Sequence, residues 1–94
     1  MFFKMFNSRQ VEGQWITDIK FRDCSFHNVC FSECVFCGTS FVGGEFARCE
    51  FRGNRYETPV LPATNKKRQA PTMDKVTRQS LEADNAAWAK ETSR

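Results

Sequence analysis

The sequence predicts an all-β solenoid followed by a C-terminal α-helix. From Ile16 to Tyr56 a large apolar residue returns at every fifth position, and a second column of mostly small residues runs two positions before it. An α-helix repeats its face every ~3.6 residues and a strand every ~2, so a step of five predicts a chain that turns after each short straight segment. The first column is Ile16, Phe21, Phe26, Phe31, Phe36, Phe41, Phe46, Phe51 and Tyr56, and the second is Ile19, Cys24, Val29, Cys34, Thr39, Gly44, Cys49 and Asn54.

The individual units follow a known motif. Residues 24–28 (CSFHN), 34–38 (CVFCG) and 49–53 (CEFRG) resemble the pentapeptide-repeat proteins, whose units run small residue, polar residue, Leu or Phe, polar residue, and often Gly. This resemblance extends over residues 16–58. It implies a right-handed quadrilateral β-helix, in which four units make one coil and the central Phe and the small residue point inward. Self-similarity at a fixed step is also the general mark of a solenoid, whose units are stabilised by their neighbours.

Residues 1–15 continue the five-residue phase in a weaker form. Phe6 and Val11 keep the large apolar column, but Lys4 and Arg9 stand where the later units have small residues. We therefore expect a degenerate first coil that caps the open end of the solenoid, as terminal repeats do. The segment is too short and too interrupted for a signal sequence or a membrane span. A membrane-surface anchor is a weaker alternative.

After Tyr56 the repeat ends and the composition changes. Residues 59–71 contain the three prolines and a basic run at 66–68, which predicts an extended linker. A helix is predicted over 72–92, because Thr72 and Asp74 are suitable N-caps and strong helix formers follow. A single helix of this length needs something to dock on: the open C-terminal end of the solenoid, an apolar side face or a second copy. Its apolar side is expected to contain Met73, Val76, Leu81 and Trp88, with Thr77, Ser80 and Ala87 between them.

The repeat divides the five cysteines into two groups. The inward group is Cys24, Cys34 and Cys49, and the outward group is Cys30 and Cys37. Their spacing around His27 is dense enough to suggest zinc, but tetrahedral ligands must converge and these residues point to different sides. We therefore predict no metal and no cofactor. An odd number of cysteines fits a reducing cytoplasm better than a secreted disulfide framework.

Catalysis is not predicted. His27 is the single histidine, it faces outward in the repeat, and no Ser or Cys has the surroundings of a known catalytic triad. Gly43 and Gly44 belong to the repeat and not to a phosphate-binding loop. We therefore expect a protein that acts by binding.

The charge distribution argues against direct binding to nucleic acid. The net charge is +3, and residues 16–58 are nearly neutral, with five basic and six acidic residues. The basic run at 66–68 is too short to predict DNA or RNA binding. Stacking of positions twenty residues apart predicts an apolar outer face and a mixed face with an acidic edge. The apolar face contains Trp15, Val35 and Cys37, and the acidic candidates are Glu33, Glu45 and Glu50, with Asp23 added from the neighbouring face.

The family resemblance implies DNA mimicry as one function. Some pentapeptide-repeat proteins occupy the DNA site of a type II topoisomerase, and small phage inhibitors of CRISPR complexes also imitate DNA. Our leading hypothesis is therefore a non-catalytic phage- or plasmid-type inhibitor that occupies the DNA site of a cytoplasmic bacterial DNA-handling complex. Glu33, Glu45, Glu50 and Asp23 are its candidate contacts. The short solenoid favours a CRISPR surveillance complex over a topoisomerase, and a homodimer joined through the C-terminal helices would double its length.

The alternative hypothesis is a scaffold module that binds a protein partner. Its docking or dimer face would consist of Trp15 and Val35 on the solenoid, with Leu81 and Trp88 on the helix. The two hypotheses differ in their response to salt, because a complex held by charge weakens as salt rises and an apolar interface does not.

Overall fold

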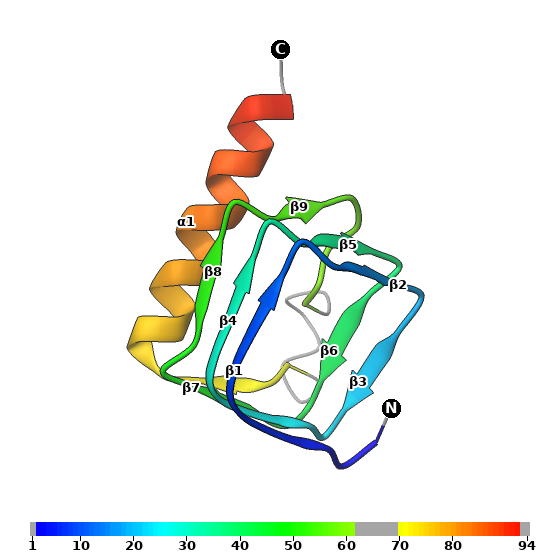
Figure 1. The fold of residues 1–94 in the computed structure, drawn as a ribbon, viewed down its shortest axis with the longest axis vertical. Helices are drawn as coiled ribbons and strands as arrows, with labels where there is room; N and C mark the ends of the chain where they lie inside the picture. Colours follow the sequence, from blue (N-terminus) through cyan, green and yellow to red (C-terminus); the bar gives the residue numbers. More distant parts are fainter. Residues whose placement is uncertain (1, 62–69, 93–94) are drawn as a thin grey trace.

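The computed structural model describes residues 2–61 and 70–92, and this part of the chain consists of short parallel strands followed by a helix (Figure 1). The predicted strand-rich fold with a C-terminal helix is therefore confirmed. The elements are β1 (Met5–Glu12), β2 (Trp15–Thr17), β3 (Lys20–Arg22), β4 (Ser25–Ser32), β5 (Val35–Cys37), β6 (Ser40–Val42), β7 (Glu45–Ala47), β8 (Glu50–Arg52), β9 (Arg55–Tyr56), β10 (Thr72–Met73) and α1 (Lys75–Thr92).

The strands pair in parallel with partners twenty residues along the chain. Phe6 lies opposite Phe26, which lies opposite Phe46, and the same step relates β2 to β5 and β3 to β6. The strand sets β1-β4-β7-β10, β2-β5-β9 and β3-β6 surround a common centre, and β8 also pairs with β4 (Figure 1). Regularly repeated parallel strands of this kind are compatible with a solenoid.

The backbone turns once in every five residues. Each turn contains a residue with positive φ, which is the left-handed region that only Gly, Asn and Asp adopt with ease. This regular corner is the physical origin of the five-residue period. The positive-φ series is Phe3, Ser8, Gly13, Asp18, Asp23, Asn28, Glu33, Gly38, Gly43, Arg48 and Gly53, with φ between 50° and 67°.

Stacked aromatic rings fill the centre of the molecule. Phe26 and Phe46 stack with ring centroids 4.6 Å apart, and Phe21 and Phe41 with centroids 4.9 Å apart. Rings of neighbouring sides meet edge to face, as between Phe26 and Phe41, and both arrangements are favourable for aromatic pairs. The small-residue column is buried with them, as predicted, including Cys24, Val29, Cys34, Thr39, Cys49 and Asn54.

The helix begins later than predicted, and only part of its predicted inner face contacts the strands. Thr72 belongs to strand β10, and Asp74 is the N-cap, because its Oδ1 accepts the N–H of Thr77 at 3.0 Å. Thr77 and Leu81 are buried against the strands. Val76 is 56% exposed, and Ala87 is also exposed, so the prediction that these two residues face the strands was wrong.

Part of the predicted linker packs against the strands. Val60 is buried, and its carbonyl accepts the N–H of Phe41 at 2.9 Å. Pro71 is also buried, at the start of β10. The basic run at 66–68 lies outside the described residues. In the described ranges, no helix combines the length and apolar character needed to cross a membrane.

Candidate interaction surfaces

The four acidic candidates lie along one sheet without forming a continuous acidic stripe. Asp23 and Glu33 occupy corners on either side of β4, while Glu45 lies on β7 and Glu50 on β8. Glu45 is bonded to His27 at 2.6 Å, and Glu50 pairs with Arg52. Arg52 therefore lowers the negative potential that Glu50 presents to a partner, and the hydrogen bond to His27 occupies one oxygen of Glu45.

The structure brings Trp15, Val35 and Cys37 together, and in the described residues α1 does not cover them. The three residues lie on paired strands β2 and β5, and they line a shallow groove of about 210 Å³ together with Arg55 and Glu57. Trp15 is 74% exposed, whereas Val35 is buried. An exposed Trp beside an apolar groove is a common feature of protein-binding surfaces.

The helix does not cover this groove, contrary to one sequence-based expectation. It packs against β7, β8 and β9 instead, beside β8 in Figure 1. Leu81 is buried in the core cluster, and Trp88 donates its Nε1–H to the carbonyl of Tyr56 at 3.1 Å. Arg55 lies over the Trp88 ring, 5.4 Å from its centroid. Leu81 and Trp88 therefore dock the helix on its own chain, away from the Trp15 groove.

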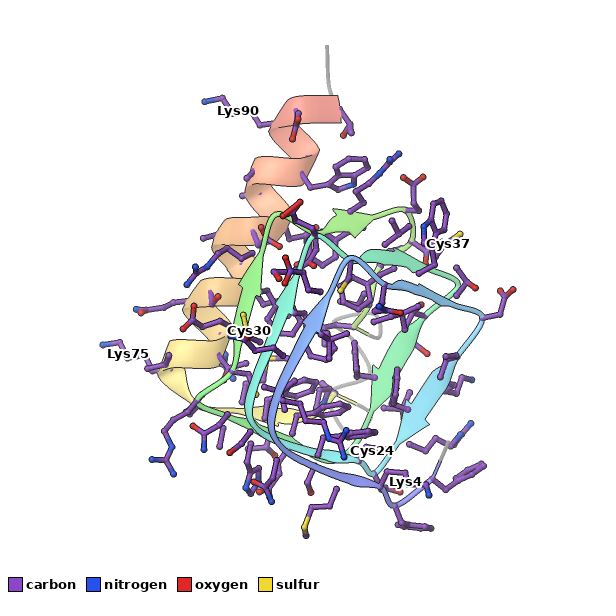
Figure 2. The ribbon with its side chains drawn as sticks, in the orientation of Figure 1. Lys4, Cys24, Cys30, Cys37, Lys75 and Lys90 are labelled. Carbon is purple, nitrogen blue, oxygen red and sulfur yellow. The ribbon has the colours of Figure 1, made fainter. Side chains whose placement is uncertain are left out.

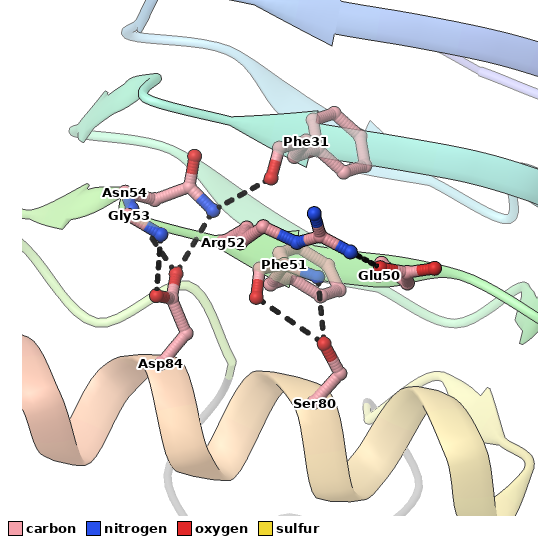
Figure 3. A network of polar contacts seen from close by, with 8 residues as sticks. All are labelled: Phe31, Glu50, Phe51, Arg52, Gly53, Asn54, Ser80 and Asp84. Atoms are coloured by element: carbon pink, nitrogen blue, oxygen red, sulfur yellow. Dashed lines mark hydrogen bonds and ion pairs between the residues drawn. The ribbon is translucent and has the colours of Figure 1, made fainter.

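Polar side chains of α1 take the place of a further strand at the C-terminal end of the repeat. The N–H of Cys49 donates to the Thr77 hydroxyl at 3.0 Å, and the N–H of Phe51 donates to the Ser80 hydroxyl at 2.8 Å. The Ser80 hydroxyl donates back to the Phe51 carbonyl at 3.2 Å, which completes a strand-like exchange (Figure 3). Unpaired strand edges are a liability in proteins, and these side chains remove it.

Asp84 is the centre of this capping network. Its carboxylate accepts the N–H of Gly53 at 2.7 Å, the N–H of Asn54 at 3.1 Å and the Asn54 side-chain amide at 2.9 Å (Figure 3). It also accepts the Tyr56 hydroxyl at 2.7 Å. Burial, followed by the bond to Asp84, raises the pKa of the Tyr56 phenol, so it remains a neutral donor.

Sequence reasoning placed Thr77 and Ser80 on this side of the helix, but it missed Asp84 and the polar role of the face because it searched for an apolar stripe. The signal was present in the spacing of Thr77, Ser80, Asp84 and Trp88, which recur every three or four residues. A strand edge needs hydrogen-bond acceptors as well as apolar cover. In the described residues, every buried polar side-chain atom has a hydrogen-bond partner.

The opposite, N-terminal end has an apolar cavity of about 260 Å³. Its lining includes Phe6, Val11, Ile16, Ile19 and Phe21, together with the polar residues Arg9 and Gln14. Residues 5–12 pair with β4 as the five-residue phase of Phe6 and Val11 predicts, but they line the cavity and do not fill it. The two ends of the repeat therefore differ: α1 closes one, and the other presents apolar surface.

The cysteines do not converge. Cys30 lies on β4 and Cys37 on β5, on different sides of the molecule (Figure 2). The inward thiols of Cys34 and Cys49 donate to backbone carbonyls of Val11 and Phe26, and burial raises the pKa of both thiols, which makes them poor nucleophiles. Within the described part of the chain, no group of three or more His, Cys, Asp or Glu residues could hold a metal ion.

Comparison of the chain with protein-family models, with curated proteins and with solved structures finds no match.

Proposed function

We propose that the repeat is a pentapeptide-repeat β-helix with four sides per coil, and that the protein acts by binding and not by catalysis. The twenty-residue register supports four units per coil, and the positive φ at every fifth residue supports a corner after each unit. A stack of this kind is rigid, because each coil is fixed by the next. It presents flat outer faces on which side chains keep constant positions.

The function that the geometry supports best is binding of a partner protein through the groove on β2, β5 and β9. The observation that carries this proposal is Trp15, which is 74% exposed beside an apolar groove that α1 leaves open. A buried aromatic anchor often provides much of the free energy of a protein interface. Arg55 and Glu57, bonded to each other at 3.1 Å, form a polar border of the groove, as is typical of an interface rim.

DNA mimicry is the second candidate function. The observation in its favour is that Asp23, Glu33, Glu45 and Glu50 share one side of the molecule, so their charges add at a distance. The pairing of Glu45 with His27 and of Glu50 with Arg52 weakens this candidate. In this proposal the protein is a phage- or plasmid-type inhibitor that excludes DNA from a bacterial DNA-handling complex.

Two half-buried cysteines offer a matched test of the groove. Cys37 lines the groove, whereas Cys30 has a similar exposure on β4, outside it. Tagged wild-type protein, Cys37→Arg and Cys30→Arg are used as baits in nuclease-treated bacterial lysate. We expect Cys37→Arg to lose a partner that Cys30→Arg and the wild type retain at high salt, because an apolar interface resists salt. Equal retention of every partner by all three baits would contradict the groove proposal.

A second bait tests DNA mimicry in the same lysate. Charge reversal at Glu33, Glu45 and Glu50 is expected to release a DNA-handling complex that short duplex DNA also displaces from the wild type. If neither the duplex nor the charge reversal displaces any partner, mimicry is contradicted. Unchanged melting of each bait shows that the fold is intact.

A further inference from the structure

The N-terminal and C-terminal ends of the repeat differ in whether the edge strand has hydrogen-bond partners. At the C-terminal end, hydroxyl and carboxylate oxygens of α1 accept the edge N–H groups of Cys49, Phe51 and Gly53. At the N-terminal end, β1 is the last strand of its sheet, and in the described residues it pairs with β4 alone. The edge of β1 turns at Ser8, which has positive φ, and on both sides of this corner it is a ready surface for pairing with another strand.

Apolar side chains concentrate at the same end. Phe2, Phe3, Met5 and Trp15 are between 61% and 76% exposed, and they account for all but one of the exposed large hydrophobic residues in the described part of the chain. At 150–250 Å² per aromatic side chain, the exposed parts of the three rings amount to roughly 300–500 Å². This is about half of the ~800 Å² that each partner buries in a stable complex.

The same end carries both the projecting rings and a hollow. The cavity whose lining includes Phe6, Val11, Ile16, Ile19 and Phe21 lies beside β1. In a dimer with a two-fold axis each copy presents this same surface to the other, so exposed rings can cover exposed rings and one hollow can close the other. We propose that the N-terminal end is a homodimer interface, in which β1 pairs antiparallel with β1 of a second copy.

The five-residue period selects the register of this pairing. The two cores join only if core-facing residues lie opposite core-facing residues, and this holds when Phe6 faces the partner's Val11. In antiparallel pairing, a step forward on one strand is a step back on the other. Phe2 therefore faces the partner's Trp15, and Met5 faces the partner's Glu12. Two of the most exposed aromatic residues cover each other in this arrangement.

The charges of the strand fit the same register. Lys4 precedes the start of β1 and Glu12 ends it, so antiparallel pairing places Lys4 next to the partner's Glu12, and the contact occurs twice. Arg9 lies beside the two-fold axis, near the partner's Arg9, which is the one unfavourable contact between like charges on the two strands. The dimer would be a longer rod with α1 at both ends. It is proposed separately from the groove, but it covers Trp15, so a second copy and a groove partner would compete for this residue.

Light scattering after size exclusion, together with sedimentation velocity, tests the proposal over micromolar to submillimolar concentrations. We expect the wild type to approach twice the chain mass of 10.9 kDa. Phe2→Asp is expected to restore the monomer mass, whereas Val76→Asp, at an exposed apolar residue on α1, is the matched control and stays dimeric. A monomeric wild type over the whole range overturns the proposal, and so does a dimer that persists in Phe2→Asp or is lost in Val76→Asp.

Cross-linking tests the register separately. Met5→Cys and Glu12→Cys are mixed under mild oxidation, and a disulfide-linked dimer is expected in the mixture and not in either variant alone. Arg9→Gln removes the like-charge contact beside the axis, so a several-fold tighter dissociation constant is expected. The wild type, with its own free cysteines, is oxidised in parallel as the control. A cross-link in either single variant that the wild type does not form, or weaker association of Arg9→Gln, overturns this register. Each variant is first checked for wild-type melting, so that loss of the fold is not counted as loss of the dimer.

Discussion

Removal of the Asp84 carboxylate is predicted to open the C-terminal end of the repeat. Asp84 accepts bonds from Gly53, Asn54 and Tyr56, and Asn54 and Tyr56 are nearly inaccessible to water, at 3% and 7% exposure. Asp84→Ala leaves these donors without their acceptor. A buried polar group that loses its partner costs about 1–3 kcal/mol, so two such groups predict a loss of about 2–6 kcal/mol in the free energy of unfolding.

The assay is urea denaturation followed by far-ultraviolet circular dichroism. A loss near 3 kcal/mol lowers the melting temperature by about 10–25 °C in a chain of this size, and the m-value is expected to stay constant if unfolding remains two-state. Glu82→Ala is the matched control, because Glu82 is an exposed acidic residue on the same helix. Its effect is expected to stay within about 0.5 kcal/mol.

A double-mutant cycle isolates the bond between Asp84 and Tyr56. Tyr56→Phe removes the hydroxyl that donates to the carboxylate at 2.7 Å and keeps the ring that stacks on Phe36. Directly bonded residues typically show a coupling energy of about 0.5–3 kcal/mol. A coupling energy near zero, or an Asp84→Ala variant as stable as the Glu82→Ala control, would refute the capping role.

Three further predictions concern the core, a corner and the helix N-cap. Phe36→Ala, at a completely buried ring, is expected to lose about 3–5 kcal/mol of unfolding free energy, and near-wild-type melting would rule out this packing. Gly44→Ala and Gly53→Ala both place Ala at positive φ, but of the two only the new Cβ at position 44 would collide with backbone, namely that of Cys24. Gly44→Ala should therefore have a clearly lower melting temperature than Gly53→Ala. Equal melting temperatures would contradict the close approach of Gly44 to Cys24. The pKa of Asp74 is lowered by its hydrogen bonds to the Thr77 hydroxyl and to backbone N–H groups, so its stabilisation is present above the unfolded-state pKa of about 4 and is lost as the pH falls through the lowered value. When the urea midpoint is measured against pH, Asp74→Asn should reduce its fall at acidic pH. An unchanged fall would contradict the role of Asp74 as a charged N-cap.

The dimer and groove proposals are tested at different residues. The groove test depends on Cys37, which lies on β5, whereas the dimer test depends on Phe2, Met5, Glu12 and Arg9 in the first coil. Loss of the partner protein without loss of the dimer, or the reverse, can therefore be observed. Trp15 lies at the border of both surfaces, and for this reason neither test uses it.

Much of the strand architecture follows from sequence periodicity. The positions of Phe26, Phe36 and Phe46 in the core follow from a five-residue step, because only a chain with regular corners can return every fifth side chain to one interior. The same step separated inward Cys34 from outward Cys37. Such features repeat many times, so the pattern is strong even though single units are degenerate.

Sequence periodicity did not predict which residues of α1 contact the strands. A hydrophobic pattern suggested that Val76 faces inward, yet Val76 is exposed and Thr77 is buried. The last coil presents edge N–H groups as well as apolar rings, and the helix face that satisfies both contains Thr77, Ser80, Leu81 and Asp84. Which polar residues are needed depends on the spacing of those N–H groups, and that spacing exists only after the strands have assembled.

The sequence alone determined that this chain repeats, where its rings are buried and where its helix lies, because these features depend on local spacing and the burial of apolar side chains. The tertiary structure decided which surfaces remain open. It brought Asp84 onto Asn54 and Tyr56, thirty and twenty-eight residues away, and thereby closed one end of the repeat. It left Trp15 and the first coil uncovered at the other end, since the position of a cap depends on contacts between distant segments that no local pattern encodes.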